Sequence, residues 1–168
     1  MGRYRDNETG RLTAGRNFPS GMAALGKMIH GKGLKYGLYS DRGFRTCQGF
    51  PGLLDNEVLD VQTMAAWGVD FLKNDGCYPT SPNLEGGIPD DPSAYEVYKR
   101  THDALQASGR AIVHNVKGTG NGGLPIDNAR AVSNMRRCGG DIGDGFGSAV
   151  GEFMQCQQFQ EHAGPGYW

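Results

Sequence analysis

The stretch Gly68-Val-Asp-Phe-Leu-Lys-Asn-Asp-Gly-Cys77 constrains the fold most, because a short apolar run in it ends abruptly in charged residues. Val69 to Leu72 predicts a buried strand. Lys73 and Asp75 are two residues apart, so their side chains leave an extended chain on the same face. A carboxylate at the carboxyl end of a parallel strand is the usual position for catalysis in barrel enzymes. The stretch therefore predicts a parallel strand that presents a functional acid, Asp75.

Helix-like and strand-like segments alternate along the rest of the chain. Such alternation implies parallel strands joined by right-handed crossovers, so we expect an α/β fold of about four βα units. Four units make half of a (β/α)8 barrel or a small open sheet. The sequence Ser-Ala-Tyr-Glu at Ser93 fits a helix capping box. The expected strands are 34–39, 69–73, 111–115 and 131–135, the expected helices are 18–31, 56–67, 93–108 and 145–160, and a loop with four prolines is expected at 78–92.

Charge and cysteine usage exclude several classes of function. The 168 residues include 17 basic and 18 acidic side chains, and no basic stripe indicates a nucleic-acid or membrane-surface partner. No apolar run approaches the roughly 20 residues that span a bilayer.

The four cysteines contain no C-x-x-C pair, which argues against zinc, and they leave three disulfide pairings open. The aromatic ending Tyr167-Trp168 follows a loop signal, so we expect the chain to be part of a larger domain.

A second acidic turn, Cys138-Gly-Gly-Asp-Ile-Gly-Asp144, follows another strand-like run. Two carboxylates on two strand ends suggest glycoside hydrolysis, which uses one as nucleophile or base and the other as acid. Asp141 lies nearer the strand end and is the better candidate for the acid. Asp144 fits a helix N-cap before Gly145. Arg136 and Arg137 could orient a sugar hydroxyl or pair with a carboxylate, although arginines are more often solvated.

A rival interpretation rests on Gly118-Thr-Gly-Asn-Gly-Gly123, which matches the dinucleotide-binding pattern G-x-G-x-x-G after a strand. Its context is weak, because the following Leu124-Pro-Ile starts no long helix and the pyrophosphate needs a helix N-terminus. Among the histidines, His114 alone is near enough to a strand end to face a site, and a structural role is favoured for it as well. The sequence contains no G-x-S-x-G nucleophile motif.

Several motifs together resemble glycoside hydrolase family 27, the α-galactosidases and α-N-acetylgalactosaminidases. They are Gly33-Leu-Lys-Tyr-Gly-Leu-Tyr-Ser-Asp41, Thr46-Cys-Gln-Gly-Phe-Pro-Gly52, Trp67-Gly-Val-Asp-Phe-Leu-Lys-Asn-Asp-Gly-Cys-Tyr78, Arg136-Arg-Cys-Gly-Gly-Asp-Ile-Gly-Asp144 and Ala163-Gly-Pro-Gly-Tyr-Trp168. The resemblance covers nearly the whole chain. It implies a single partial (β/α)8 catalytic domain over residues 1–168, similar to strands three to six of the family barrel. The family's first strands, last strands and C-terminal β-domain are absent from these residues.

The resemblance also implies a chemistry and residue roles. The activity would be retaining hydrolysis that releases terminal α-linked galactose from oligosaccharides or glycolipids, without a metal or organic cofactor. Asp75 matches the family's nucleophile and Asp141 its acid/base. Retention predicts that these carboxyls lie about 5 Å apart. By the same resemblance, Lys73, Arg137 and Tyr39 match sugar-contacting positions, and Cys47 and Cys77 match a disulfide beside the site. It further implies a homodimer and a secreted or lysosomal or vacuolar location, although the chain shows no signal peptide.

Departures from the family pattern keep alternatives open. Lys117 stands where the family reads the C2 group of the sugar, so galactose and N-acetylgalactosamine are not distinguished. Arg136 replaces a usual tryptophan, and Cys138 and Cys156 have no obvious family partners. A non-catalytic sugar-binding homologue is the other alternative, against which the two intact carboxylates argue. Whether residues 1–168 are active by themselves also stays open.

Overall fold

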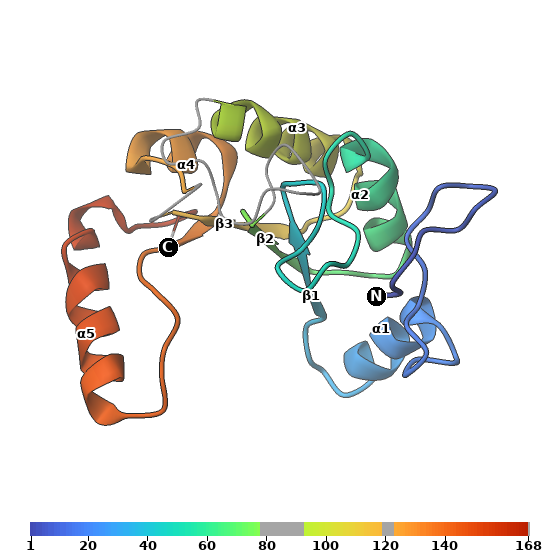
Figure 1. The fold of residues 1–168 in the computed structure, drawn as a ribbon, viewed down its shortest axis with the longest axis horizontal. Coiled ribbons are helices and arrows are strands. Elements are labelled where there is room, and N and C mark those ends of the chain that lie inside the picture. The colour runs from blue at the N-terminus through green and yellow to red at the C-terminus, as the bar shows by residue number, and fades with distance from the viewer. Residues whose placement is uncertain (78–92, 119–122, 168) are drawn as a thin grey trace.

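A computed structural model describes residues 1–77, 93–118 and 123–167 of the protein, in which helices and parallel strands alternate (Figure 1). The expected α/β class is therefore confirmed. The strands are β1 Gly37–Asp41, β2 Phe71–Asp75, β3 Val113–Lys117 and β4 Met135–Arg137. The helices are α1 Met22–His30, α2 Glu57–Ala66, α3 Ser93–Ala107, α4 Ile126–Val132 and α5 Phe146–Gln157, followed by the 3-10 turn η1 Gln160–His162.

The four strands form one parallel sheet in the order β1-β2-β3-β4. Tyr39 pairs with Lys73 and Asp41 pairs with Asp75. Because side chains alternate between the two faces of a sheet, paired positions point to the same face. Lys73 in turn pairs with Asn115, so polar side chains form rows across one face near the carboxyl ends of the strands.

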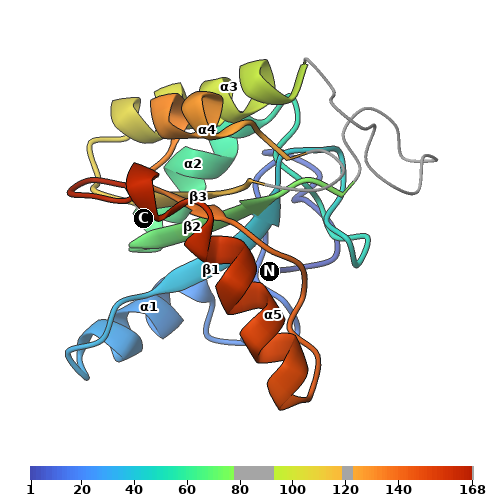
Figure 2. The ribbon, with the colours of Figure 1, turned by 90° about the vertical axis from the view of Figure 1, so that its left-hand side faces the viewer.

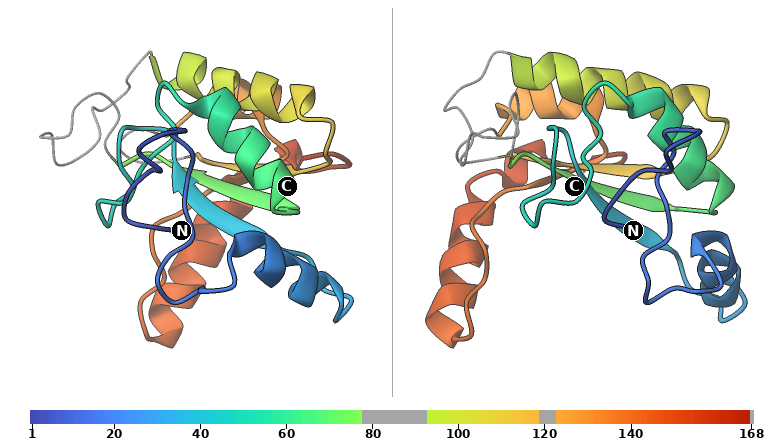
Figure 3. Two further views of the ribbon diagram at one scale, coloured as in Figure 1. Left: turned by 90° about the vertical axis from the view of Figure 1, so that its right-hand side faces the viewer. Right: turned by 45° about the vertical axis from the view of Figure 1, so that its right-hand side comes forward.

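Helices α2, α3 and α4 cover one face of the sheet, whereas α1 and α5 lie toward its β1 and β4 sides (Figures 1 and 3). A core between the sheet and α1, α2 and α3 is centred on Met64 and Leu72, both completely buried. A second core under α3 and α4 includes Tyr98, Val116 and Val132. Helix α5 extends away from the sheet (Figure 2), and none of its residues is buried in the described part of the chain.

A polar clamp holds the amino end of β2. Asp70 accepts hydrogen bonds from the His30 ring at 2.7 Å, from the Tyr36 N–H at 2.8 Å and from the Arg110 guanidinium at 2.8 Å. Arg110 also donates to the backbone oxygens of Gly68 and Val69. These contacts join α1, β2 and the segment before β3 at the edge of the sheet opposite the strand ends described above.

The N-terminal segment is fastened to α2 by Arg5. Its guanidinium contacts both carboxylate oxygens of Asp60 and donates to the backbone oxygens of Gly10 and Gly52. The Asp60 side chain is completely buried. Burial raises the pKa of this carboxyl, and the Arg5 contact opposes that shift. Arg5 therefore compensates a charge that the core would otherwise exclude.

The structure confirms the expected helices in outline but moves the first three strands toward the C-terminus by about two residues. β1 was expected at 34–39, β2 at 69–73 and β3 at 111–115, whereas each observed strand extends into the polar residues that follow. Asp75 is thus the last residue of β2. The ladder continues because backbone pairing does not depend on apolar side chains.

Two local predictions are wrong. Residues 131–135 were expected to form a strand, but the chain there ends helix α4 and starts β4 only at Met135. Ala129 and Val132 are both buried, and their spacing of three residues is that of a helix face. The N-cap of α5 is Gly145, without a side-chain cap, so Asp144 does not cap this helix.

Three predictions fall on residues outside the described ones: the loop 78–92, the Ser93 capping contact and most of the G-x-G-x-x-G segment. Among the described helices, none is long and apolar enough to cross a membrane.

Candidate active site

A cavity of about 920 Å³ opens at the carboxyl ends of the strands. Strand pairing explains its composition, because the polar rows of β1 and β2 lie on this side of the sheet. Every residue that the sequence analysis assigned to the site lines this cavity: Tyr39, Cys47, Lys73, Asp75, Cys77, Arg137 and Asp141. The structure thus brings together side chains that span more than a hundred positions of sequence.

Asp75 is almost completely buried, and its carboxylate accepts three hydrogen bonds. Its residue is 5% exposed. Oδ2 receives hydrogen bonds from the Lys73 ammonium at 3.1 Å and the Tyr39 hydroxyl at 3.2 Å, and Oδ1 receives one from the Gly76 N–H at 3.0 Å. Burial alone would raise the pKa of Asp75, but the Lys73 charge and these three hydrogen bonds outweigh it, so the pKa is lowered. The carboxylate is therefore held ionised in a largely enclosed position.

Tyr39 links this carboxylate to its neighbours. Its hydroxyl also lies 3.3 Å from Sγ of Cys47, and the Lys73 ammonium lies 5.1 Å from the centre of its ring. Burial, followed by the negative charges of Asp75 and Asp41, raises the pKa of Tyr39. The phenol consequently stays protonated and acts as a hydrogen-bond donor.

Asp141 lies in the loop between β4 and α5 and has different surroundings. Its side chain is 95% exposed, and Oδ1 lies 2.8 Å from a guanidinium nitrogen of Arg137. Arg137 also donates from Nε to the backbone oxygen of Gly139 at 2.7 Å. Arg137 therefore holds both the loop and the carboxylate that the loop carries. Asp75 and Asp141 therefore line the same cavity but differ strongly in burial.

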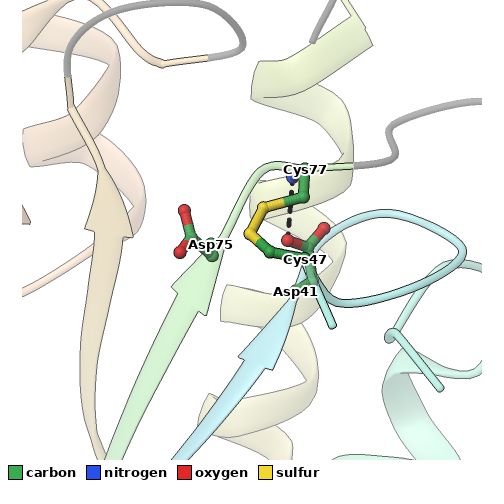
Figure 4. A group of neighbouring side chains, drawn as sticks. All are labelled: Asp41, Cys47, Asp75 and Cys77. Atoms are coloured by element: carbon green, nitrogen blue, oxygen red, sulfur yellow. Dashed lines mark hydrogen bonds between the residues drawn. A yellow bond between two sulfur atoms is a disulfide. The ribbon is translucent and has the colours of Figure 1, made fainter. Parts of the chain in front are cut away.

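Cys47 and Cys77 form a disulfide that joins the loop after β1 to the end of β2. Asp41, Cys47, Asp75 and Cys77 cluster closely: one carboxylate oxygen from each aspartate and the two sulfur atoms all lie within 4.8 Å of one another (Figure 4). A cysteine binds metal as a thiolate, and the sulfurs of a disulfide are not thiolates. The two cysteines therefore form a cross-link next to Asp75 and do not make a zinc site with the aspartates.

Cys138 and Cys156 form a second disulfide, for which the sequence analysis found no family partners. The bond ties the start of the Asp141 loop to the last turn of α5. Glu152 and Gln155 of α5 line the cavity as a result. A side chain at Gly139 would overlap the Glu152 carboxylate, so this glycine permits the close approach of the helix. Oε2 of Glu152 is buried and accepts no hydrogen bond from the residues that the structure describes.

Three other polar residues near the strand ends, Lys117, Arg136 and His114, differ in whether they line the cavity. Lys117 lines the cavity. Arg136 points elsewhere, since its guanidinium lies 4.0 Å from the centre of the Phe159 ring. His114 is buried and contacts the Val132 oxygen at 2.8 Å and the Asn74 amide at 3.2 Å. Burial lowers the pKa of His114 to about 4, and His114 is not among the residues that line the cavity.

Sequence reasoning missed Asp41 and Glu152 as members of this region. Asp41 stood inside a recognised motif, and its place at the end of a strand, paired with Asp75, could have identified it. No comparable signal exists for Glu152. Its position depends on how α5 is tied to the loop, which the sequence pattern does not specify.

The family model described as alpha galactosidase A, of the melibiase type, matches residues 1–168. An α-galactosidase of Oryza sativa subsp. japonica is 38% identical over 165 residues, which cover 98% of this chain and 37% of that protein. An α-N-acetylgalactosaminidase of Gallus gallus is 35% identical over 176 residues, covering 99% of this chain and 41% of that protein.

Among solved structures, the α-galactosidase of Saccharomyces cerevisiae with raffinose superposes with a TM-score of 0.73. It is 33% identical, and the match covers 85% of this chain and 30% of that one. The chain thus spans less than half the length of each of these proteins.

Proposed function

We propose, on the premise that this chain belongs to the alpha galactosidase A family, that the protein is a retaining glycosidase that releases terminal α-linked galactose. One observation carries the proposal. Asp75 is held ionised by Lys73 and Tyr39 at the end of β2, in a cavity that Asp141 also lines. An ionised carboxylate and a second carboxyl group facing one sugar are the equipment of a two-step displacement.

In the first step, a carboxylate oxygen of Asp75 attacks the anomeric carbon of the bound galactoside, and the bond to the leaving-group oxygen breaks. Asp141 donates its proton to that oxygen. The product is a galactosyl ester of Asp75 with inverted configuration. In the second step, Asp141 takes a proton from water, the water oxygen attacks the anomeric carbon, and the ester bond to Asp75 breaks. Two inversions restore the original α configuration.

The neighbouring side chains support these steps. Lys73 and Tyr39 keep Asp75 ionised before attack and stabilise it again as the leaving carboxylate. Lys73 and Arg137 have further N–H donors for sugar hydroxyls in the cavity, and the Tyr39 hydroxyl, which donates its proton to Asp75, can accept a hydrogen bond from one. Retention requires the carboxyls of Asp75 and Asp141 to act from opposite sides of one carbon, about 5–5.5 Å apart.

The substrate class follows from the family and from the cavity. Relatives named α-galactosidases, one of them solved with raffinose, favour oligosaccharides with a terminal α-galactose, and the same linkage in a glycolipid would fit. An α-N-acetylgalactosaminidase is the alternative, because Lys117, which lines the cavity, stands at the position matched to recognition of the C2 group and does not distinguish the two sugars. Comparing kcat/KM for nitrophenyl α-galactoside and nitrophenyl α-N-acetylgalactosaminide would distinguish the two.

A non-catalytic sugar-binding homologue is a further alternative. The ordered contacts around Asp75 argue against it, because binding alone does not need an enclosed ionised carboxylate. Calorimetry would separate the two: galactose binding by a protein that hydrolyses neither nitrophenyl substrate would favour the binding module.

We further propose that residues 1–168 form part of one (β/α)8 catalytic domain, because the relatives are more than twice as long as the matched segment.

The two disulfides support a secreted or lysosomal or vacuolar location, where thiols are oxidised. Peptide mapping without reductant should recover Cys47 joined to Cys77 from the natural protein. The family resemblance also predicts a homodimer, which sedimentation of the purified protein would test.

The central test is hydrolysis of nitrophenyl α-galactoside by the protein in its natural full length, with and without Asp75→Asn. Loss of the nucleophile should lower kcat by at least about 10³-fold. Asp103→Asn on α3 is a matched control, because this exposed aspartate pairs only with Lys99 in the described contacts. Turnover that survives Asp75→Asn would remove Asp75 as the nucleophile.

A further inference from the structure

Asp41 is the last residue of β1 and the pairing partner of Asp75 on β2. Its residue is 0% exposed, and it is not among the residues that line the cavity. Its two carboxylate oxygens contact two different segments. Oδ1 accepts a hydrogen bond from the Gly43 N–H at 2.8 Å, and Oδ2 accepts one from the Cys77 N–H at 2.8 Å (Figure 4).

Those two N–H groups belong to the chain segments that surround Asp75. Gly43 starts the loop that carries Cys47, and Cys77 directly follows the end of β2. The backbone oxygen of Asp75 is held as well, by the Arg42 N–H at 2.9 Å and the Tyr98 hydroxyl at 3.1 Å. The backbone is therefore fixed at Asp75 and again two residues later.

Gly76 lies between these two fixed points and links the fixed backbone to the Asp75 side chain. Gly76 donates its N–H to Oδ1 of Asp75 at 3.0 Å. With residues 75 and 77 both anchored, the direction of that N–H is fixed, and the carboxylate that accepts it is oriented. A charged acceptor forms stronger hydrogen bonds to backbone N–H groups than a neutral one, so the anionic form of Asp41 anchors best.

We propose that Asp41 is the positioning residue for Asp75: its carboxylate ties the loop after β1 to the end of β2 and so sets the direction from which Asp75 attacks. The inference rests on the nucleophilic role proposed for Asp75. Asp41 is buried and does not line the cavity, so it acts only through the backbone at the ends of the two neighbouring strands.

The surroundings of Asp41 predict a pH dependence. Burial raises the pKa of Asp41 to about 6, against the opposing effect of the two N–H bonds, and the Asp75 charge adds to the rise while Arg42 opposes it. Among the residues that the structure describes, Tyr39 and Tyr98 are the other titratable groups that interact electrostatically with Asp41. As pH falls through about 6, Asp41 gains a proton and its hold on the Cys77 N–H weakens. The acid side of the kcat profile should therefore contain a step near pH 6, above the ionisation of Asp75.

The test compares the pH profiles of kcat for the wild-type protein and Asp41→Asn in its natural full length. Asparagine presents one oxygen and one N–H₂ group, so one of the two backbone contacts is lost. We expect kcat to fall by about 10–100-fold, as for a nucleophile displaced by a fraction of an ångström. KM should change by less than about threefold, and the step near pH 6 should disappear. Asp103→Asn is the matched control and should keep the wild-type profile.

Each outcome decides the inference. Wild-type kcat in Asp41→Asn, or a step near pH 6 that persists in it, would overturn the positioning role. If circular dichroism shows that Asp41→Asn does not fold, the wild-type profile decides, since an acid limb without a step between pH 5 and pH 7 would contradict the inference. Asp75→Asn separates this result from the proposed function. If that variant is inactive while Asp41→Asn behaves as wild type, only the positioning role fails.

Discussion

The ammonium nitrogen of Lys73 lies 3.1 Å from Oδ2 of Asp75, two residues farther along the same strand. The strand geometry produces this contact, because alternate residues of a strand point to the same face. Lys73 is about one-third exposed, so solvent screens part of its charge. It nevertheless opposes the effect of burial on Asp75 and favours the ionised form.

Replacing Lys73 should therefore change the pH range of activity. Lys73→Met removes the charge and the hydrogen bond, so the pKa of Asp75 should rise and its carboxylate should become protonated at higher pH. The acid limb of kcat/KM should move upward by on the order of one pH unit. Lys99→Met, which removes an exposed lysine from α3, is the control. An acid limb that stays in place would show that Lys73 does not set the ionisation of Asp75.

Asp141→Asn should affect substrates according to their leaving groups. A sugar leaving group needs a proton, so kcat/KM for an α-galactosyl oligosaccharide should fall by about 10²–10⁴-fold. A nitrophenolate leaves without protonation, so the first step with nitrophenyl α-galactoside should lose much less. Asp144→Asn, an exposed neighbour in the same loop, should change neither. Equal losses with both substrates would contradict the assignment of Asp141 as the acid.

The Cys138–Cys156 bond should contribute both stability and substrate affinity. α5 buries none of its residues in the described part of the chain, so packing does little to hold it. The double variant Cys138→Ser/Cys156→Ser should lose up to about 3 kcal/mol of unfolding free energy in a denaturant titration, as expected for a loop of this length. Freeing α5 should also withdraw Glu152 from the cavity and raise KM. An unchanged unfolding midpoint and KM would mean that other contacts fix the helix.

Arg5→Met should be more harmful than the loss of the whole ion pair. The single variant leaves the Asp60 carboxylate buried without its cation, which costs about 3–5 kcal/mol at neutral pH. Arg5→Met/Asp60→Leu removes both charges and should recover most of that loss. Urea unfolding of the two variants at pH 7 measures the difference. A double variant no more stable than the single one would show that Arg5 acts through its backbone contacts instead.

The sequence predicted four of the five described α-helices and the parallel arrangement of the strands, but it missed α4 and located the first three strands too early. Apolar residues mark the part of a strand that packs beneath the helices. At its carboxyl end each strand continues through polar residues such as Ser40 and Asp41, or Asn74 and Asp75, which are paired in the ladder. Tyr39, Lys73 and Asp75 of the site are themselves strand residues, so apolar patterning ends before the strand does.

The last βα unit was predicted least well, for a different reason. The run Ala131 to Met135 is short and apolar, and periodicity cannot distinguish a buried strand from a helix end at that length. The packing of α4 on α3 and β3 decides between them, and this is a long-range contact. The partners of Cys138 and Cys156 were likewise undetermined, because four cysteines allow three pairings.

The residues proposed for the site were identified mainly by family resemblance, and the structure gathers all of them at one cavity. Their catalytic and binding roles stay predictions. Asp41 was not identified, because its importance comes from the two backbone N–H groups that it accepts, and a sequence pattern does not reveal such contacts.

Two acidic groups flank strand β2: Asp70 of the clamp lies immediately before it, and Asp75 is its last residue. Only the four residues 71–74 separate them, yet they share no hydrogen-bond partner in the described contacts. Residues around His30 and Arg110 can accordingly be varied to raise stability without touching the residues that line the cavity. Changes made on the two sides should combine additively.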